Sequence, residues 1–139
     1  SFGQDKTSSA KLPNLLEQSG YTYSKVSDNI WTIPFHGKAL PDFKVMISTG
    51  EGMAVIFVVV AEKNQLRVTP ELMRSLLLMN DDFDRVKIGI DKHGDLFVRI
   101  DSTVRVMDLE ELKANIEQVA AATDEITKAI KPYIIQSKQ

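Results

Sequence analysis

The sequence predicts an α+β domain in which helices cover one face of an antiparallel sheet of about five to six strands. Six β-prone stretches come in three pairs, and turn-forming residues separate the members of each pair, as in antiparallel hairpins. Helical stretches stand before, between and after these hairpins, which gives the order α-β-β-β-β-α-β-β-α. With 139 residues, 43% of them hydrophobic, the chain is long enough to bury one compact core.

The N-terminal residues 1–10 are mostly small and polar, so we expect a flexible tail ahead of a single α+β domain over residues 11–135. The first helix is predicted over residues 12–19, because Pro13 is tolerated only in a first helical turn. Gly20 then follows as the C-terminal cap of this helix.

The first four strands are predicted from paired β-prone stretches. Residues 21–26 and 30–35 form the first pair, and residues 43–49 and 53–61 form the second. Polar residues connect the first two strands. In the second pair, glycines at both ends of a three-residue connection supply the positive φ that a tight turn needs. We therefore expect two consecutive antiparallel hairpins.

A second helix and a third hairpin follow. Thr69 as N-cap and Pro70 at the first helical position begin the helix, which is predicted to end near Asn80. In the third hairpin, apolar and polar residues alternate, so one face is expected in the core. That face consists of Val86, Ile88, Ile90, Leu96, Val98 and Ile100.

The last predicted element is a long helix. Asp108 and Glu111 have the spacing of a capping box, and apolar positions then recur every three or four residues. Pro132 cannot donate the hydrogen bond that would continue the helix. The helix is therefore predicted to run from Leu109 to about Ile130, a length of about 22 residues or roughly 33 Å.

Composition excludes several classes of function. Seventeen Lys and Arg residues against nineteen Asp and Glu residues leave a formal net charge of −2, and no apolar run approaches the ~20 residues that span a bilayer. We therefore expect no nucleic-acid partner and no membrane insertion. The absence of cysteine excludes disulfides and cysteine-ligated metals. We expect a cytoplasmic protein. The alternative is a periplasmic or secreted protein that has lost its signal peptide, because the chain begins with Ser1 rather than methionine.

Alternating acidic residues over positions 91–95 resemble the start of a calcium-binding loop. Counted from Asp91, the sixth position is Leu96 instead of glycine and the twelfth is Ser102 instead of glutamate. The segment also lies between two predicted strands rather than two helices. We therefore interpret it as a hairpin turn.

Other polar residues give equally weak evidence for a catalytic or metal-binding site. Asp81, Asp82 and Asp84 are interpreted as a solvated loop, and His36 and His93 as surface histidines without a third zinc ligand. No serine occupies a nucleophile elbow and no glycine pattern forms a phosphate-binding loop. We therefore expect no catalytic residue, no metal, no cofactor and no enzymatic activity.

The strand over residues 53–61 is apolar on both faces, which indicates a second cover. With Thr49 placed opposite Met53, helices are expected to cover the face that bears Phe57. The other face then needs a partner protein or the chain's own terminal segments. We predict a protein-interaction surface made of Met46, Ile56, Val58 and Val60.

Several short segments occur in an order that is similar to a known family. They are residues 20–35, the helix end at Met79 and Asn80, residues 87–91, then Gly94, Asp95, Leu96, Asp101, Arg105, Asp108 and Leu112. These segments resemble the YbjN family, which is described as bacterial sensory transduction regulators. The resemblance extends from about Leu12 to Ile130 and implies the type III secretion chaperone-like fold.

The resemblance implies protein binding more than an activity. Secretion chaperones of this fold are small acidic homodimers that bind extended segments of client proteins, and YbjN-like proteins have a regulatory role. We therefore expect a non-enzymatic protein-interaction module, chaperone-like or regulatory, whose partner is another protein or a second copy in a homodimer. The alternative is a small-ligand-binding sensor domain with a pocket between the long C-terminal helix and the sheet.

Overall fold

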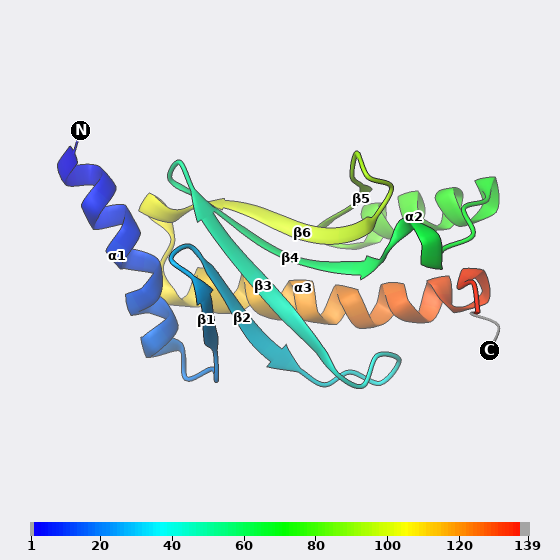
Figure 1. Cartoon of the computed structure of the whole chain (residues 1–139), viewed down its shortest axis with the longest axis horizontal. Helices are drawn as coiled ribbons and strands as arrows, with labels where there is room; N and C mark the ends of the chain where they lie inside the picture. The colour runs from blue at the N-terminus through cyan, green and yellow to red at the C-terminus, as the bar shows by residue number, and fades with distance from the viewer. Residues whose placement is uncertain (1, 137–139) are drawn as a thin grey trace.

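The computed structural model describes residues 2–136, with side chains described from residue 10 onward. Within these residues, six strands form one antiparallel sheet in the order β1-β2-β3-β4-β6-β5, accompanied by three α-helices (Figure 1). The predicted α+β class and element order are confirmed. The helices are α1 (Phe2–Ser19), α2 (Pro70–Asp82) and α3 (Leu109–Ile130). The strands are β1 (Ser24–Ser27), β2 (Ile30–Phe35), β3 (Phe43–Gly50), β4 (Met53–Ala61), β5 (Lys87–Ile90) and β6 (Leu96–Thr103).

Helix α1 is longer than predicted. It begins at Phe2, so Pro13 lies inside it rather than in its first turn. The expected tail of residues 1–10 is therefore helical from its second residue onward, and its first residue lies outside the described part of the chain. The buried side chains Leu12 and Leu16 hold this helix against the domain, which offsets the hydrogen bond that the proline cannot donate.

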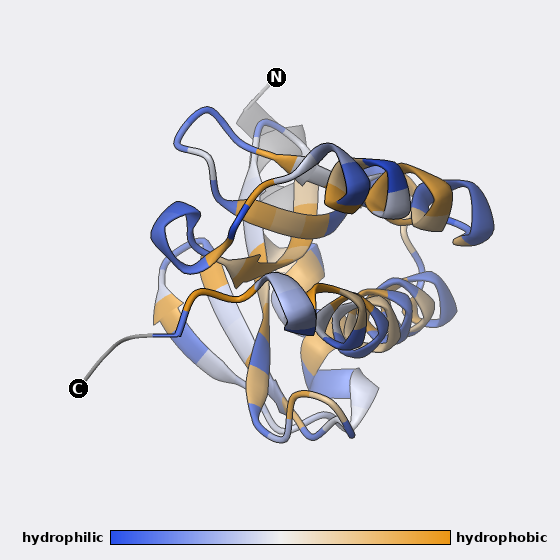
Figure 2. Cartoon of the chain, turned by 90° about the vertical axis from the view of Figure 1, so that its right-hand side faces the viewer, coloured by the Kyte–Doolittle hydropathy of each residue, from blue (hydrophilic) through white to orange (hydrophobic). Residues whose placement is uncertain are grey.

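Helix α3 runs from Leu109 to Ile130, as predicted. The carboxylate of Asp108 caps it by accepting a hydrogen bond of 2.7 Å from the backbone N–H of Glu111. The helix packs against β3, β4 and β6, and in Figure 1 β3 passes in front of it. Figure 2 shows α2 and α3 on the same side of the strands, which confirms that helices cover one face of the sheet.

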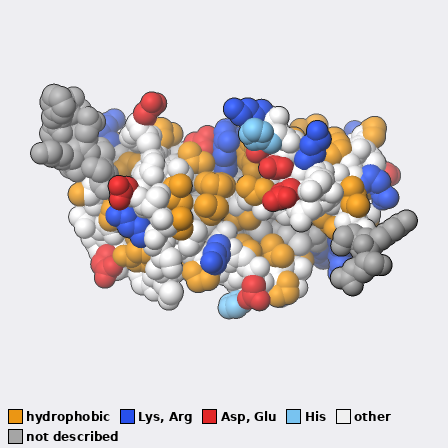
Figure 3. Space-filling view, viewed as in Figure 1, with side chains coloured by type: hydrophobic (Ala, Val, Ile, Leu, Met, Phe, Trp, Pro, Cys, Tyr) orange, Lys and Arg blue, Asp and Glu red, His pale blue; other side chains and the backbone are white. Residues whose placement is uncertain are grey.

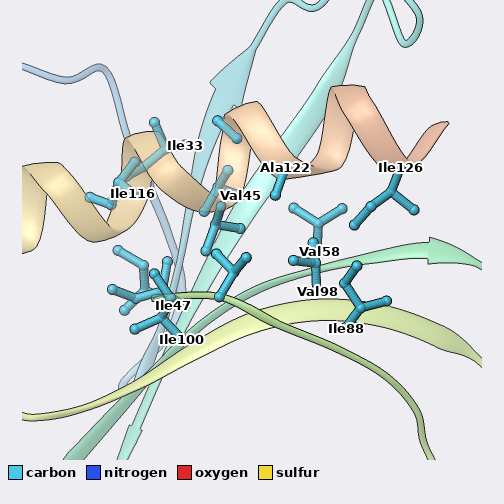
Figure 4. Packing of buried hydrophobic residues seen from close by; sticks show 14 of the residues in the cluster. Ile33, Val45, Ile47, Val58, Ile88, Val98, Ile100, Ile116, Ala122 and Ile126 are labelled. Carbon is cyan, nitrogen blue, oxygen red and sulfur yellow. The ribbon is translucent and has the colours of Figure 1, made fainter. Parts of the chain in front are cut away.

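The core lies between α3 and this covered face. Figure 4 shows Ala122 and Ile126 of α3 above Val58 of β4 and Val98 of β6, and all four side chains are buried. Burying an aliphatic side chain of this size stabilises the fold by roughly 1.5 to 3 kcal/mol. The layer between α3 and the sheet therefore supplies much of the favourable free energy of folding.

The register of the β3–β4 hairpin differs from the prediction by one residue. Gly50 pairs with Met53, so the turn contains only Glu51 and Gly52, whose φ angles are 53° and 77°. Two positive φ angles are what a two-residue hairpin turn of type I′ requires. The predicted pair of Thr49 with Met53 is therefore wrong, and the shift exchanges the faces on which the two strands meet.

Helix α2 begins as predicted and lies beside β5, the strand at one edge of the sheet. The hydroxyl of Thr69 accepts a hydrogen bond of 3.1 Å from the backbone N–H of Leu72. Leu76 is buried, whereas Leu77 is 68% exposed. Ile90 of β5 was predicted to face the core, but it is 40% exposed. Their exposure follows from the position of α2 and β5 at the edge, where only one neighbour covers each element.

Candidate protein-binding surface

The face of the sheet opposite α3 has no helix in front of its middle strands β3, β4 and β6 (Figure 1), and we call it the open face. Alternate residues of each strand point to this face, and the ladder aligns them in rows. In one row, Met46 of β3 lies opposite Phe57 of β4, which lies opposite Arg99 of β6. In the next row, Val59 lies opposite Phe97.

Five apolar side chains gather on the open face, and we call them the apolar patch. They are Met46, Val55, Phe57, Val59 and Phe97. Val59 is 44% exposed and the other four are half-buried. In Figure 3, which shows the open face, hydrophobic side chains gather over the middle of the sheet. Contiguous exposed apolar surface of this kind is typical of a binding site, whereas single exposed apolar residues are ordinary.

The ring of Phe97 lies against the backbone of Gly89 on the neighbouring strand. A Cβ atom at position 89 would come within 2.5 Å of the ring, so any other residue there would displace the ring. The guanidinium carbon of Arg99 lies 4.7 Å from the centre of the same ring, within the range of a cation–π contact. The aromatic ring is therefore held on the sheet surface from two sides.

The charged side chains of the strands on the open face are mostly basic. They are Lys44, Lys87 and Arg99, against the single carboxylate of Asp101. The ammonium of Lys87 lies 3.1 Å from Asp101 Oδ2, and Arg99 Nε lies 3.2 Å from Asp101 Oδ1 without the alignment of a hydrogen bond. Three cations and one carboxylate leave this face basic, although the chain as a whole is acidic.

The edge of the sheet at β5 is closed by a side chain. The amide group of Asn80 in α2 donates to the carbonyl oxygen of Ile88 (3.1 Å) and accepts from the N–H of Ile88 (2.7 Å). One asparagine thus occupies both outward-facing backbone groups of the middle of β5. Closing an edge in this way prevents another strand from pairing there.

The opposite edge is different. All four residues of β1 (Ser24–Ser27) are exposed, and a bulge between Lys25 and Ser27 interrupts the pairing with β2. Among the described residues, no hydrogen bond reaches the outer backbone groups of β1. The two edges are therefore unequal, because Asn80 occupies the outer backbone groups of β5, whereas the outer backbone groups of β1 have no such partner among the described residues.

The structure places the four predicted interaction residues on different parts of the molecule. Met46 belongs to the apolar patch. Ile56 and Val58 are 0% and 5% exposed beneath α3, so the predicted exposure of both residues is wrong. Val60 is the extra residue of a β-bulge between Val59 and Ala61, and it lines a cavity beside α3 instead of the open face.

Sequence reasoning missed four members of the patch, which are Val55, Phe57, Val59 and Phe97. For Val55, Phe57 and Val59 the cause is the register of the β3–β4 hairpin, because a slip of one residue exchanges the two faces of a strand. Phe97 lies on β6, outside that hairpin, and joins the patch through its pairing with Val59. The signal that could have corrected the register is the pair Glu51-Gly52, since a two-residue turn ending in glycine is a common hairpin connection.

The acidic residues considered above as candidate sites lie in a hairpin turn and at the end of a helix. The carboxylate of Asp91 accepts hydrogen bonds from the N–H groups of Asp95 (3.1 Å) and His93 (2.8 Å), which close the hairpin turn and lower the pKa of Asp91. Asp81 and Asp82 belong to the last turn of α2. In the described part of the chain, no group of three or more His, Asp or Glu side chains could hold a metal ion. None of the described helices is long and apolar enough to cross a membrane.

The amino-acid sequence matches no protein-family model and no curated protein. The structure is similar to a chain of the heterodimeric complex ExoU-SpcU from the type III secretion system of Pseudomonas aeruginosa. That match has a TM-score of 0.61 at 18% identity and covers 86% of this chain and 97% of the other.

The structure is also similar to YbjN from E. coli, with a TM-score of 0.61 at 13% identity over 93% of this chain and 96% of the other. A third match is the complex of the Yersinia pestis type III secretion chaperone SycH with a stable fragment of YscM2. Its TM-score is 0.52 at 11% identity, covering 86% of this chain and 98% of the other. The chain therefore has the fold shared by YbjN and the type III secretion chaperones, as the sequence resemblance implied.

Proposed function

We propose that the chain is a non-enzymatic protein-interaction module, chaperone-like or regulatory, which binds a segment of a partner protein on the open face of its sheet. The apolar patch carries this proposal, because it is the part of the sheet that no element of the described chain covers. The fold supports the same role, since two of its structural neighbours were solved in complexes with proteins. The described residues offer no catalytic constellation that would favour an enzyme.

The chemistry of the rim indicates what kind of segment binds. Lys44, Lys87 and Arg99 surround the apolar patch, and Asp101 offsets only one of these charges. A second copy of the chain that packed against this face through a two-fold axis would bring basic rim against basic rim. A partner segment with apolar side chains and flanking carboxylates instead matches both the patch and its rim.

The magnitude of the binding energy favours a second contact. Completing the burial of the five patch side chains contributes roughly 1 kcal/mol each, or about 5 kcal/mol in total. Association itself costs about 4 to 15 kcal/mol, so the patch alone gives weak binding. Backbone pairing at the unoccupied edge of β1 is the second contact that the fold offers, because β5 is closed by Asn80.

The test selects short random peptides displayed on phage against the wild-type chain, and then measures their affinity by fluorescence anisotropy. We compare the wild-type chain with Val59→Asp, which places a carboxylate in the patch. Val68→Asp is the matched control, because Val68 is 52% exposed and lies outside the sheet. Circular dichroism verifies that both variants remain folded.

We expect selected peptides to combine apolar and acidic residues, and Val59→Asp to weaken them at least about tenfold, which corresponds to about 1.4 kcal/mol. Val68→Asp leaves their affinity unchanged. Failure to select any peptide, or equal affinity for Val59→Asp, would contradict the proposal. Sedimentation velocity adds a further check: a wild-type dimer that Val59→Asp dissociates would make a second copy the occupant and overturn the proposed partner chemistry.

A further inference from the structure

A cavity of about 250 Å³ lies at the C-terminal end of α3, on the side of the sheet away from the apolar patch. Its walls come from four separate parts of the chain. They are the end of β4 (Val60, Ala61), the loop before β3 (Ala39, Leu40), the end of α3 (Thr127, Ile130) and the C-terminal segment (Lys131, Ile134, Ile135). Gln65 lies at the rim. Most of this lining is aliphatic.

The β-bulge at the end of β4 creates the wall of this cavity on the sheet side. In a regular strand, successive side chains would alternate between the two faces, but the ladder shifts between Val59 and Ala61. Val60 and Ala61 consequently both line the cavity, while Val59 remains on the open face. Bulges that turn a side chain toward a site are common at the ends of strands and beside functional sites.

The C-terminal segment forms the opposite wall as a short strap. After α3, residues 131–133 make one 3-10 turn, and Ile134 then pairs with Leu66 in an isolated antiparallel bridge. The N–H of Arg67 donates to the carbonyl of Tyr133 (2.7 Å), and the N–H of Ile135 donates to the carbonyl of residue 65 (2.8 Å). Figure 2 looks onto this end of the molecule and shows the segment running from α3 across the ends of the strands.

Two of the side chains that line the cavity, those of Lys131 and Gln65, carry hydrogen-bond donors. Lys131 supplies an ammonium group, and no carboxylate lines the cavity. The side-chain oxygen of Gln65 already accepts a hydrogen bond of 2.8 Å from the N–H of Glu62, which leaves the amide NH₂ group as its donor. A half-open aliphatic cavity whose lining includes one cation and one amide donor matches a ligand with a hydrocarbon body and an anionic end.

We propose that this cavity binds a small aliphatic carboxylate, with its hydrocarbon chain against Val60, Leu40 and Ile130 and its carboxylate at Lys131 and Gln65. The volume sets the size of the ligand. An apolar cavity of about 150 Å³ takes benzene, and sites for drug-sized molecules start at about 300 Å³. A monocarboxylate with a medium-length chain lies between these limits, and its binding is a function separate from partner binding on the open face.

The test uses octanoate as the probe, with 1-octanol and octylamine as probes of equal chain length and different end groups. Amide chemical shifts of the isotope-labelled full chain report where each probe binds. Lys131→Gln removes the cation at the cavity. Lys128→Gln is the matched control, since it makes the same change on an exposed residue of α3 that does not line the cavity.

We expect saturable shifts from octanoate at Thr127, Lys131, Ile134 and Ile135, and weaker binding of octanol and octylamine. Lys131→Gln reduces the octanoate affinity about fivefold, as expected for loss of a partly exposed ion pair, and Lys128→Gln does not. Thr127→Phe, which fills the cavity from a half-buried position, abolishes the shifts. Absence of saturable shifts at these residues, or equal binding of all three probes to the wild-type and Lys131→Gln chains, would overturn the proposal.

Discussion

Replacing Val58 or Val59 with alanine measures which face of β4 is covered, and the two neighbours serve as controls for each other. Val58 is 5% exposed beneath α3, whereas Val59 is 44% exposed on the open face. Each substitution removes two carbon atoms, and each carbon is worth about 0.8 kcal/mol when it is fully buried. The same chemical change is therefore made once in the core and once on the surface.

The expected losses of unfolding free energy differ clearly. For Val58→Ala, about 1.6 kcal/mol of lost burial and roughly 1 kcal/mol for the cavity left behind give about 2.5 kcal/mol. For Val59→Ala, about half of the burial is lost and solvent fills the space, so the loss is below about 1 kcal/mol. Both variants remain folded if the wild-type stability lies within the usual range of about 5 to 15 kcal/mol.

Urea denaturation followed by circular dichroism gives both values on the same scale. We expect Val58→Ala to shift the midpoint substantially and Val59→Ala to shift it little, with similar slopes. Equal losses, or a larger loss for Val59→Ala, would refute the assignment of the two faces. The proposed binding surface would then be on the wrong side of the sheet.

Three further predictions concern other parts of the fold. Asn80→Ala removes both hydrogen bonds that close the edge of β5, so we expect the unfolding free energy from urea denaturation to fall by about 1 to 3 kcal/mol and the variant to self-associate in sedimentation. A monomeric variant with the stability of the wild type would contradict the role of Asn80. Gly37→Ala places a Cβ atom onto the carboxylate of Asp124, which accepts hydrogen bonds from the neighbouring loop, so the melting temperature of this variant should fall. Gly50→Ala is the control: a Cβ atom there has no neighbour within 4 Å, so the melting temperature should hardly change. Burial and, to a smaller extent, a hydrogen bond to a carboxylate of α3 raise the pKa of Tyr21 to about 12, so the stability linked to its neutral form is present below about pH 10 and is lost as the pH rises to about 12. Tyr21→Phe should therefore lose less stability than the wild type between about pH 10 and about pH 12, and identical pH profiles of the two proteins would disprove the linkage.

The elements with local signals could be predicted closely from the sequence. Asp108 at the N-cap, the repeating apolar positions and Pro132 fixed both ends of α3, and Thr69 with Pro70 fixed the start of α2. Each of these signals acts within one or two helical turns. Local chemistry alone therefore determines them.

The open face could not be predicted in the same way, because it depends on pairing between strands. Both faces of β4 are apolar, so the alternation of its side chains did not reveal which face α3 covers. The register depended on Glu51, a non-glycine residue at φ 53° in a two-residue turn. Long-range features such as the edge closed by Asn80 and the ring of Phe97 over Gly89 leave no pattern within a short stretch of sequence.

The central claim, that the open face is the binding surface, is tested most directly by amide chemical-shift mapping of the isotope-labelled chain with a peptide selected on the wild-type protein. We predict that the largest shifts fall on β3, β4 and β6, at Met46, Phe57, Val59 and Phe97, and that they disappear in Val59→Asp. Shifts confined to α3 or α2, and retained in that variant, would contradict the claim.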